Sequence, residues 1–143
     1  MQSSKPILLV EDDRVDAMTV KRALKELSRP NLLIHKTNGQ EALEYLRDES
    51  NERPYIILLD LNMPKMNGIE FLKIIKADDA LKSIPVVVLS TSNEECDMAE
   101  SFKLNVTGYV VKQIDCKKFV ETIRTIDRYW SLSEMPKEER NHE

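Results

Sequence analysis

The chain has 143 residues, of which 41% are hydrophobic and 32% are charged. This length and composition are typical of one soluble globular domain with a sizeable core, and they exclude an intrinsically disordered chain. The 21 Lys and Arg residues against 25 Asp and Glu residues leave a net charge of −4. That balance argues against a nucleic-acid-binding or anionic membrane-binding surface, because both require clustered basic residues.

Targeting and cross-linking signals are also missing from the sequence. The start of the chain lacks the long apolar region of a signal peptide, and its apolar runs are much shorter than the roughly 20 residues that span a bilayer. Two cysteines, Cys96 and Cys116, are too few for a disulfide framework or a zinc site, so free thiols are expected. These features predict a cytoplasmic protein.

Five short apolar runs are predicted as strands. Four of them are rich in β-branched residues and do not alternate with polar ones, which is typical of strands buried on both faces of a parallel sheet. The remaining run, 32–37, is more polar and is predicted to be an edge strand. In chain order the predicted strands are Ile7–Val10, Leu32–Thr37, Ile56–Leu59, Val86–Leu89 and Tyr109–Val111.

The segments between these strands have apolar residues at helical spacing. The stripes are Ala17, Val20, Leu24 and Leu27; Leu43 and Leu46; Ile69, Leu72 and Ile75; and Phe119, Ile123, Ile126 and Trp130. The segment from Asn93 to Phe102 is more polar, so its helix is expected to be loosely held and to bury only Met98, Ala99 and Phe102. Alternating strands and helices predict a doubly wound α/β sandwich with right-handed crossovers.

The domain organisation follows from where this pattern stops. One domain is predicted over residues 1–130, followed by a polar C-terminal tail over residues 131–143 with no output domain. The tail contains Pro136 and little apolar surface to bury, which is typical of a mobile appendage.

Polar groups follow four of the five predicted strands. The first strand is followed by Glu11, Asp12 and Asp13, and the third is followed by Asp60. The fourth is followed by Ser90, Thr91 and Ser92, and the fifth by Lys112. Open α/β sheets bind ligands at the carboxyl ends of their strands, so these groups are expected to converge on one small pocket. The edge strand is expected to contribute nothing, and His35 is interpreted as an ordinary edge-strand residue.

Clustered carboxylates repel one another, and a bound divalent cation usually resolves the repulsion. Oxygen ligands in a small site favour Mg²⁺. With a lysine and a hydroxyl nearby, the set suits phosphoryl transfer to an aspartate. Each group alone has an ordinary explanation: Asp13 as a helix cap, Asp60 as a turn residue, Ser90 as a helix-start hydroxyl and Lys112 as a surface lysine. Their placement at successive strand ends favours the joint interpretation.

Four motifs resemble the receiver domain of two-component response regulators, from about residue 6 to Trp130. They are Ile7-Leu8-Leu9-Val10-Glu11-Asp12-Asp13, the run from Leu58 to Gly68, Pro85-Val86-Val87-Val88-Leu89-Ser90, and Gly108-Tyr109-Val110-Val111-Lys112. Within this family the chain is most similar to stand-alone regulators of the cyanobacterial phytochrome type. The resemblance implies a flavodoxin-like fold with five parallel strands in the order 2-1-3-4-5 and five helices.

The resemblance also implies a role for each matching residue. Asp60 would be the phosphoacceptor for a sensor histidine kinase, and Mg²⁺ or Mn²⁺ would be held by Glu11, Asp12, Asp60 and the backbone carbonyl of Asn62. Ser90 and Lys112 would contact the phosphoryl group, and Tyr109 would be an aromatic switch. A surface formed by the fourth helix, fifth strand and fifth helix would contact a downstream protein target, without nucleic acid or membrane. Homodimerisation on phosphorylation is a further hypothesis.

Two departures from the family pattern concern residues that would modulate the reaction. Lys112 is followed by Gln113, where receivers usually have a proline with a cis bond, so a trans or strained bond is expected. Thr91 replaces a small residue beside Ser90, and its bulk is expected to slow self-dephosphorylation. Ser92 belongs to the same modulating group.

Two alternative functions remain open at this point. An aspartate-nucleophile phosphatase of the haloacid dehalogenase type needs a second Asp two residues after its nucleophile, and the chain has Asn62 there. A receiver that no longer takes phosphate and acts only as a binding module is the other alternative, since Gln113 stands where receivers usually have a proline. The preferred function is a signalling switch that catalyses its own phosphorylation and dephosphorylation.

Overall fold

The computed structural model describes residues 5–26, 32–61, 66–90 and 95–111, together with individual positions between 117 and 128. The predicted tail over residues 131–143 lies outside the described residues. For Glu26, Ser90 and residues 95–97 the description covers the backbone and not the side chain.

Five parallel strands form one sheet in the order β2-β1-β3-β4-β5. The strands are β1 Ile7–Val10, β2 Leu33–Lys36, β3 Ile56–Leu59, β4 Val86–Ser90 and β5 Gly108–Val111. All five predicted strands are therefore confirmed, with ends displaced by one residue at most. The β2 residues are half-buried whereas those of β1 and β3 are buried, as expected for a strand at the edge of the sheet.

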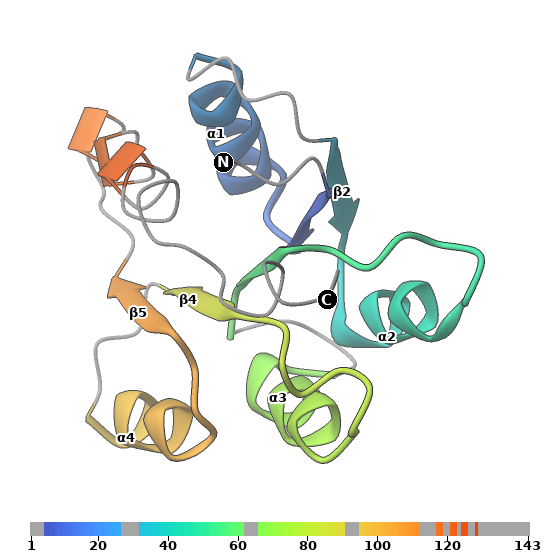
Figure 1. Ribbon diagram of the computed structural model, residues 1–143. Coiled ribbons are helices and arrows are strands. Elements are labelled where there is room, and N and C mark those ends of the chain that lie inside the picture. The colour runs from blue at the N-terminus through green and yellow to red at the C-terminus, as the bar shows by residue number, and fades with distance from the viewer. Residues whose placement is uncertain are drawn as a thin grey trace.

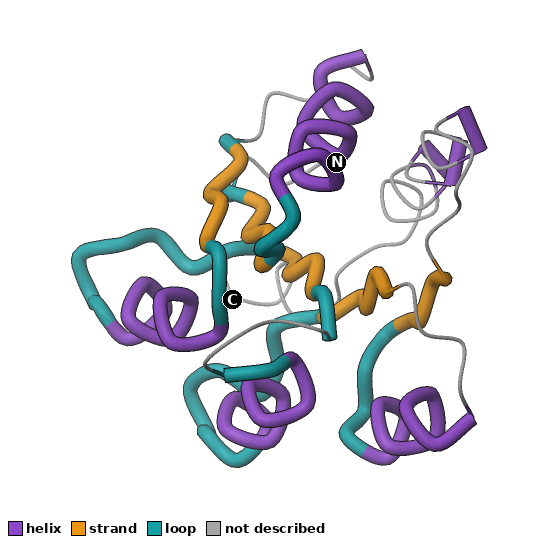
Figure 2. Tube along the Cα trace, turned by 180° about the vertical axis from the view of Figure 1, so that it is seen from behind, coloured by secondary structure: helices purple, strands orange, loops and turns teal. Residues whose placement is uncertain are grey.

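Helices cover both faces of this sheet. The described helices are α1 Arg14–Glu26, α2 Gly39–Arg47, α3 Gly68–Lys76 and α4 Glu95–Lys103. In Figures 1 and 2, α1 covers one face and α2, α3 and α4 cover the other. No described helix is long and apolar enough to cross a membrane. The described positions between 117 and 128 are helical, but the stripe predicted for the fifth helix falls on residues outside the description.

Alternation along the strands divides the core into two layers. Leu8, Ile57 and Val88 point to the face of α2 and α3, where the fully buried Phe71 lies among them. Leu9, Leu58 and Leu89 point to the opposite face and pack on α1. Because both faces are covered, neither set meets solvent, and each strand reads as a continuous apolar run.

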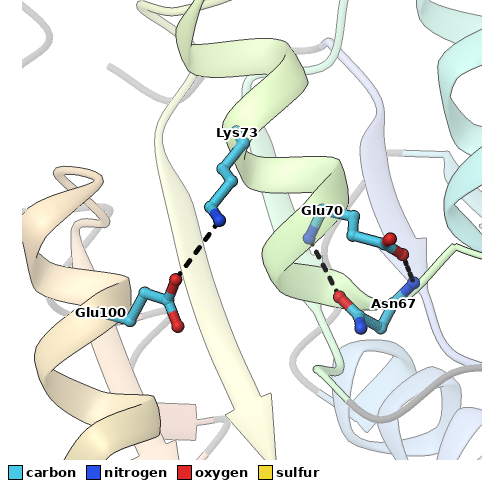
Figure 3. Close-up of polar contacts among 4 residues, drawn as sticks. All are labelled: Asn67, Glu70, Lys73 and Glu100. Atoms are coloured by element: carbon cyan, nitrogen blue, oxygen red, sulfur yellow. Dashed lines mark hydrogen bonds and ion pairs between the residues drawn. The ribbon is translucent and has the colours of Figure 1, made fainter.

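The starts of α2 and α3 are fixed by asparagine caps. The Asn38 side chain accepts a hydrogen bond from the Glu41 backbone N–H at 2.9 Å. Asn67 and Glu70 form a reciprocal capping box, in which each side chain accepts from the other residue's N–H, at 2.9 and 3.0 Å (Figure 3). Both Asn-Gly pairs of the sequence therefore place the asparagine at the cap and the glycine in the first helical turn.

The predicted buried face of the fourth helix is wrong. Phe102 is 50% exposed and Ala99 is exposed, whereas Ser101 is completely buried. The helix end explains this rotation: Asn105 has a φ of 63°, the Asn105 N–H donates to the Phe102 carbonyl and the Val106 N–H to the Ser101 carbonyl. This cap directs Leu104 and Val106 onto the core, and Ser101 turns inward with them.

Among the described residues, one ion pair links α4 to α3. The Lys73 Nζ atom lies 3.5 Å from a Glu100 carboxylate oxygen, which joins α3 to α4 (Figure 3). Both side chains are about half exposed, and exposed ion pairs of this kind add less than about 1 kcal/mol. The sequence-based expectation of a loosely held helix is consistent with these contacts, although the residues that face the core differ.

Replacing Ser101 by alanine is expected to stabilise the protein. The Ser101 Oγ atom is buried and has no hydrogen-bond partner among the described residues, and an unsatisfied buried hydroxyl costs about 1–3 kcal/mol. We expect the free energy of unfolding to rise by about 1 kcal/mol in urea titration. Ser83→Ala, at an exposed turn, is the matched control with no expected change. A loss of stability in Ser101→Ala would contradict the prediction.

Candidate functional site

The register of the central strands brings Glu11 and Asp60 together. Val10 of β1 pairs with Leu59 of β3, so the next residue of each strand leaves the sheet at the same edge. The Asp60 N–H donates to the Val10 carbonyl at 3.0 Å, which continues the ladder by one bond beyond the strands. Two residues separated by 49 positions in the chain therefore become neighbours at the carboxyl edge of the sheet.

Three carboxylates gather at this edge. One carboxylate oxygen from each of Glu11, Asp12 and Asp60 lies within 4.8 Å of the other two. Glu11 and Asp60 are 1% and 5% exposed, whereas Asp12 is exposed. This hard-oxygen donor set fits Mg²⁺ or Mn²⁺, and the open Asp12 side leaves room for the waters that Mg²⁺ retains. The predicted convergence of these three acids is therefore observed.

The fourth acid of the cluster region, Asp13, has the capping role predicted for it. Its Oδ1 atom accepts hydrogen bonds from the N–H groups of Val15 at 2.9 Å and Asp16 at 3.0 Å, at the start of α1. The Asp13 N–H in turn donates to Glu11 Oε2 at 3.1 Å. Asp13 therefore orients the Glu11 side chain through its backbone and uses its own carboxylate for the helix.

Gly68 sets the position of the segment that follows Asp60. The Gly68 N–H donates to the Leu61 carbonyl at 2.9 Å, which brings the start of α3 onto the end of β3. A Cβ atom added to Gly68 would lie 2.6 Å from Leu61 Cα and 2.7 Å from the Asp60 carbonyl oxygen. The sequence pattern alone does not reveal this close approach.

The remaining predicted site residues are described only in part. Ser90 pairs with Val111 at the ends of β4 and β5, and Val88 pairs with Tyr109. The half-buried Tyr109 packs against the core layer that contains Phe71. Asn62, Thr91, Ser92, Lys112 and Gln113 lie outside the described residues. Their roles, and the geometry of the Lys112–Gln113 bond, stay predictions.

His35 is a neighbour of the site that sequence reasoning missed. Its Nε2 atom lies 2.8 Å from the carbonyl oxygen of Glu11. Among the described residues, the carboxylate cluster takes no ligand from the edge strand, but the His35 side chain of that strand contacts the backbone of the acidic segment. The side chain on β2 reaches the acidic segment because His35 pairs with Leu9, two residues before Glu11. Only the strand order 2-1-3 makes that contact recognisable, since it places β2 directly beside β1.

A cavity of about 380 Å³ lies elsewhere, at the amino ends of β3 and β4. Its lining includes Tyr45, Arg53 and Leu81, and the Tyr45 hydroxyl donates to the Glu52 carbonyl at 3.0 Å. Burial, with a smaller contribution from the Glu52 charge, raises the pKa of Tyr45. The acidic cluster, which sits at the opposite edge of the sheet, is the better candidate site because its charged groups converge.

Comparison with known proteins agrees with this geometry. The sequence profile of the response regulator receiver domain matches residues 7–124. The chain is 40% identical over 130 residues to the response regulator Rcp1 of Synechocystis sp., a match that covers 88% of each chain.

Solved structures show the same similarity in three dimensions. The phosphorylated cyanobacterial phytochrome response regulator RcpA is 38% identical with a TM-score of 0.87, over 94% of this chain and 98% of that one. The Mn²⁺-bound form of Rcp1 is 37% identical with a TM-score of 0.86, over 93% of this chain and 98% of that one. The chain therefore belongs to the response regulator receiver domain family of two-component signalling.

Proposed function

We propose that Asp60 accepts a phosphoryl group from a histidine kinase and that this modification changes a protein-binding surface of the domain. The observation that carries the proposal is the position of Asp60: it is buried at a strand end, with two further carboxylates within reach of one cation. A phosphorylated form of the similar protein RcpA supports it. The chain acts as a receiver in two-component signalling, and the acceptor residue is the specific part of the proposal.

The chemistry follows from the acids that the fold places together. A carboxylate oxygen of Asp60 attacks the phosphorus of a phosphohistidine; the new P–O bond forms as the P–N bond breaks, and the leaving imidazole keeps the bond's electron pair and takes up a proton. Glu11, Asp12, Asp60 and the Asn62 carbonyl would hold a divalent cation. A bound cation would offset the charge on the phosphoryl oxygens. Ser90 and Lys112 would contact the same oxygens.

A metal-dependent role fits the similar protein solved with Mn²⁺. In this chain the supporting observation is the donor set itself. Three carboxylates this close together are mutually repulsive unless a cation or a proton intervenes.

The proposed output is a surface and not a released product. Phe102 on α4 is 50% exposed, and Tyr109 on β5 is half-buried. Apolar side chains on two neighbouring elements suit contact with a downstream protein. Tyr109 is the proposed aromatic switch between the inactive and active states of this surface. Homodimerisation through this surface would be a second use of it.

The proposed phosphodonor is a sensor histidine kinase, and the phytochrome regulators among similar proteins favour a phytochrome-like one. Val15 and Met18 on α1 are 68% and 57% exposed and follow directly after the acidic segment. Exposed apolar side chains beside the acceptor site suit transient contact with a partner helix.

The first experiment is phosphorylation by acetyl phosphate with Mg²⁺, read by mass spectrometry of the intact protein. We expect a stoichiometric gain of one phosphoryl group in the wild type, none in Asp60→Asn, and none in wild type treated with EDTA. Asp13→Asn is the matched control, because it removes a neighbouring charge while an asparagine can still cap α1, and it should be phosphorylated.

The outcomes separate the alternatives. No mass gain in the wild type would favour a receiver that acts only as a binding module. Rapid release of phosphate over many turnovers would favour an aspartate-nucleophile phosphatase. Gain that persists in Asp60→Asn would place the acceptor elsewhere.

A further inference from the structure

Three of the contacts that hold the segment with Glu11 and Asp12 are hydrogen bonds to Glu11. The Glu11 N–H donates to the Lys36 carbonyl at 2.9 Å, and Glu11 Oε2 accepts from the Asp13 N–H at 3.1 Å. The third bond joins the Glu11 carbonyl oxygen to His35 Nε2 at 2.8 Å. A carbonyl oxygen only accepts, so Nε2 carries the hydrogen in this contact.

This third bond lies where the backbone ladder ends. The strand β2 stops at Lys36, the Thr37 N–H donates to the Glu41 side chain at 3.1 Å, and Asn38 already caps α2. The chain of β2 has therefore turned away from β1 at the level of the Glu11 carbonyl. The His35 side chain reaches forward along the edge strand and supplies a donor at that level.

The bond constrains both acids because they share a peptide plane. The Glu11 carbonyl, the Asp12 nitrogen and the Asp12 Cα atom belong to one planar group, so fixing the carbonyl direction fixes the position of the Cα atom that carries the Asp12 side chain. Asp12 is exposed, and solvent alone would leave its segment free to reorient. Glu11, by contrast, is buried and anchored through its side chain.

We infer that His35 is a positioning residue, which preorganises Glu11 and Asp12 for a divalent cation through the Glu11 carbonyl. The inference rests on the proposed function, since it concerns the same cation. It assigns the edge strand a part in the site: β2 supplies no ligand but orients two of them. Partners that orient metal ligands typically alter affinity by about 10-fold to 100-fold when they are removed.

The test compares side chains at position 35 by their ability to donate. His35→Leu removes the donor, and His35→Gln offers an amide N–H at a similar distance from the backbone. The matched control is Lys36→Leu, because its side chain lies over the Tyr45 ring, 5.7 Å from the centroid, while its backbone bond to Glu11 is retained. Mn²⁺ dissociation constants are measured by electron paramagnetic resonance of the free ion, and folding is checked by circular dichroism in EDTA.

The expected result is a pattern and not a single loss. His35→Leu should weaken Mn²⁺ binding by about 10-fold, His35→Gln should recover most of that loss, and Lys36→Leu should bind as the wild type does. Should His35→Leu not fold, His35→Val is the second variant without a donor, since valine is well suited to a strand.

Four results would overturn the inference. Equal Mn²⁺ affinity in wild type and His35→Leu would overturn the positioning role of His35 and leave the proposed function intact. Equal losses in His35→Leu and Lys36→Leu, or no recovery in His35→Gln, would show that strand packing matters and not the donated bond. A wild type that binds no Mn²⁺ and takes no phosphate would overturn the proposed function and this inference together.

Discussion

Replacing Gly68 by alanine is expected to destabilise the domain and to slow phosphorylation of Asp60. The added Cβ atom would lie 2.6 Å from Leu61 Cα and 2.7 Å from the Asp60 carbonyl oxygen, both of them backbone atoms that no rotamer change can move. Helix propensity alone predicts the opposite sign, because alanine is favoured over glycine in a helix by about 1 kcal/mol. The steric effect should prevail.

The expected magnitudes follow from the need to move backbone. Overpacking of this kind costs about 2 kcal/mol, which corresponds to a fall in Tm of about 6 °C in a domain of this size. Displacing Asp60 from its neighbours by a fraction of an ångström should slow acetyl phosphate labelling by about 10-fold or more. Differential scanning calorimetry and intact-mass time courses measure the two effects.

The other two glycines supply a graded control. At Gly108 the nearest atoms to an added Cβ are the Val87 methyl groups at 4.0 Å, an ordinary contact. At Gly39 the nearest are Met66 Cγ and Sδ at 3.0 Å, in a side chain that can move, and the Met66 backbone oxygen at 3.1 Å. We expect little loss at Gly108, an intermediate loss at Gly39 and the largest at Gly68. A Gly68→Ala protein as stable as Gly108→Ala would refute the steric account.

The sequence predicts most of this fold because the central strands are covered on both faces. Runs such as Ile56–Leu59 are continuously apolar, which identifies them as buried strands, and the spacing between successive strands leaves room for one helix. The acids at the carboxyl edge are predictable for the same reason: Glu11 and Asp60 each follow the last apolar residue of a buried strand. Because the two strands are parallel and in register, both residues leave the sheet at the same edge.

What could not be predicted depends on contacts between distant segments. The face that α4 buries is set by its C-terminal cap at Asn105, which docks Leu104 and Val106, and a helical stripe count does not include those residues. The contact of His35 with Glu11 spans 24 positions and requires the strand order. The steric role of Gly68 can be recognised only when the distance between the start of α3 and the Asp60 backbone is known.

Neutralising Asp12 is expected to change stability in opposite directions with and without metal. The Asp12, Glu11 and Asp60 carboxylates lie within 4.8 Å of one another, and two unit charges about 4 Å apart repel by about 4 kcal/mol at an effective dielectric constant of about 20. Because Asp12 is exposed, solvent screening reduces the relief in Asp12→Asn to about 1 kcal/mol. The variant should therefore be more stable than wild type in EDTA.

With Mg²⁺ the order should reverse, because the ligand that the substitution removes is needed for binding. A cation present at about 100 times its dissociation constant adds about 2.7 kcal/mol to the free energy of unfolding, and Asp12→Asn should lose most of that gain. Urea unfolding in EDTA and in millimolar Mg²⁺ measures both terms on one protein.

Asp13→Asn changes the formal charge equally but lies outside the three-carboxylate cluster, so it should keep the Mg²⁺ gain. If Asp12→Asn were stabilised by Mg²⁺ as strongly as wild type, Asp12 would not be a ligand, and a fall in stability in EDTA would show that the acids do not repel.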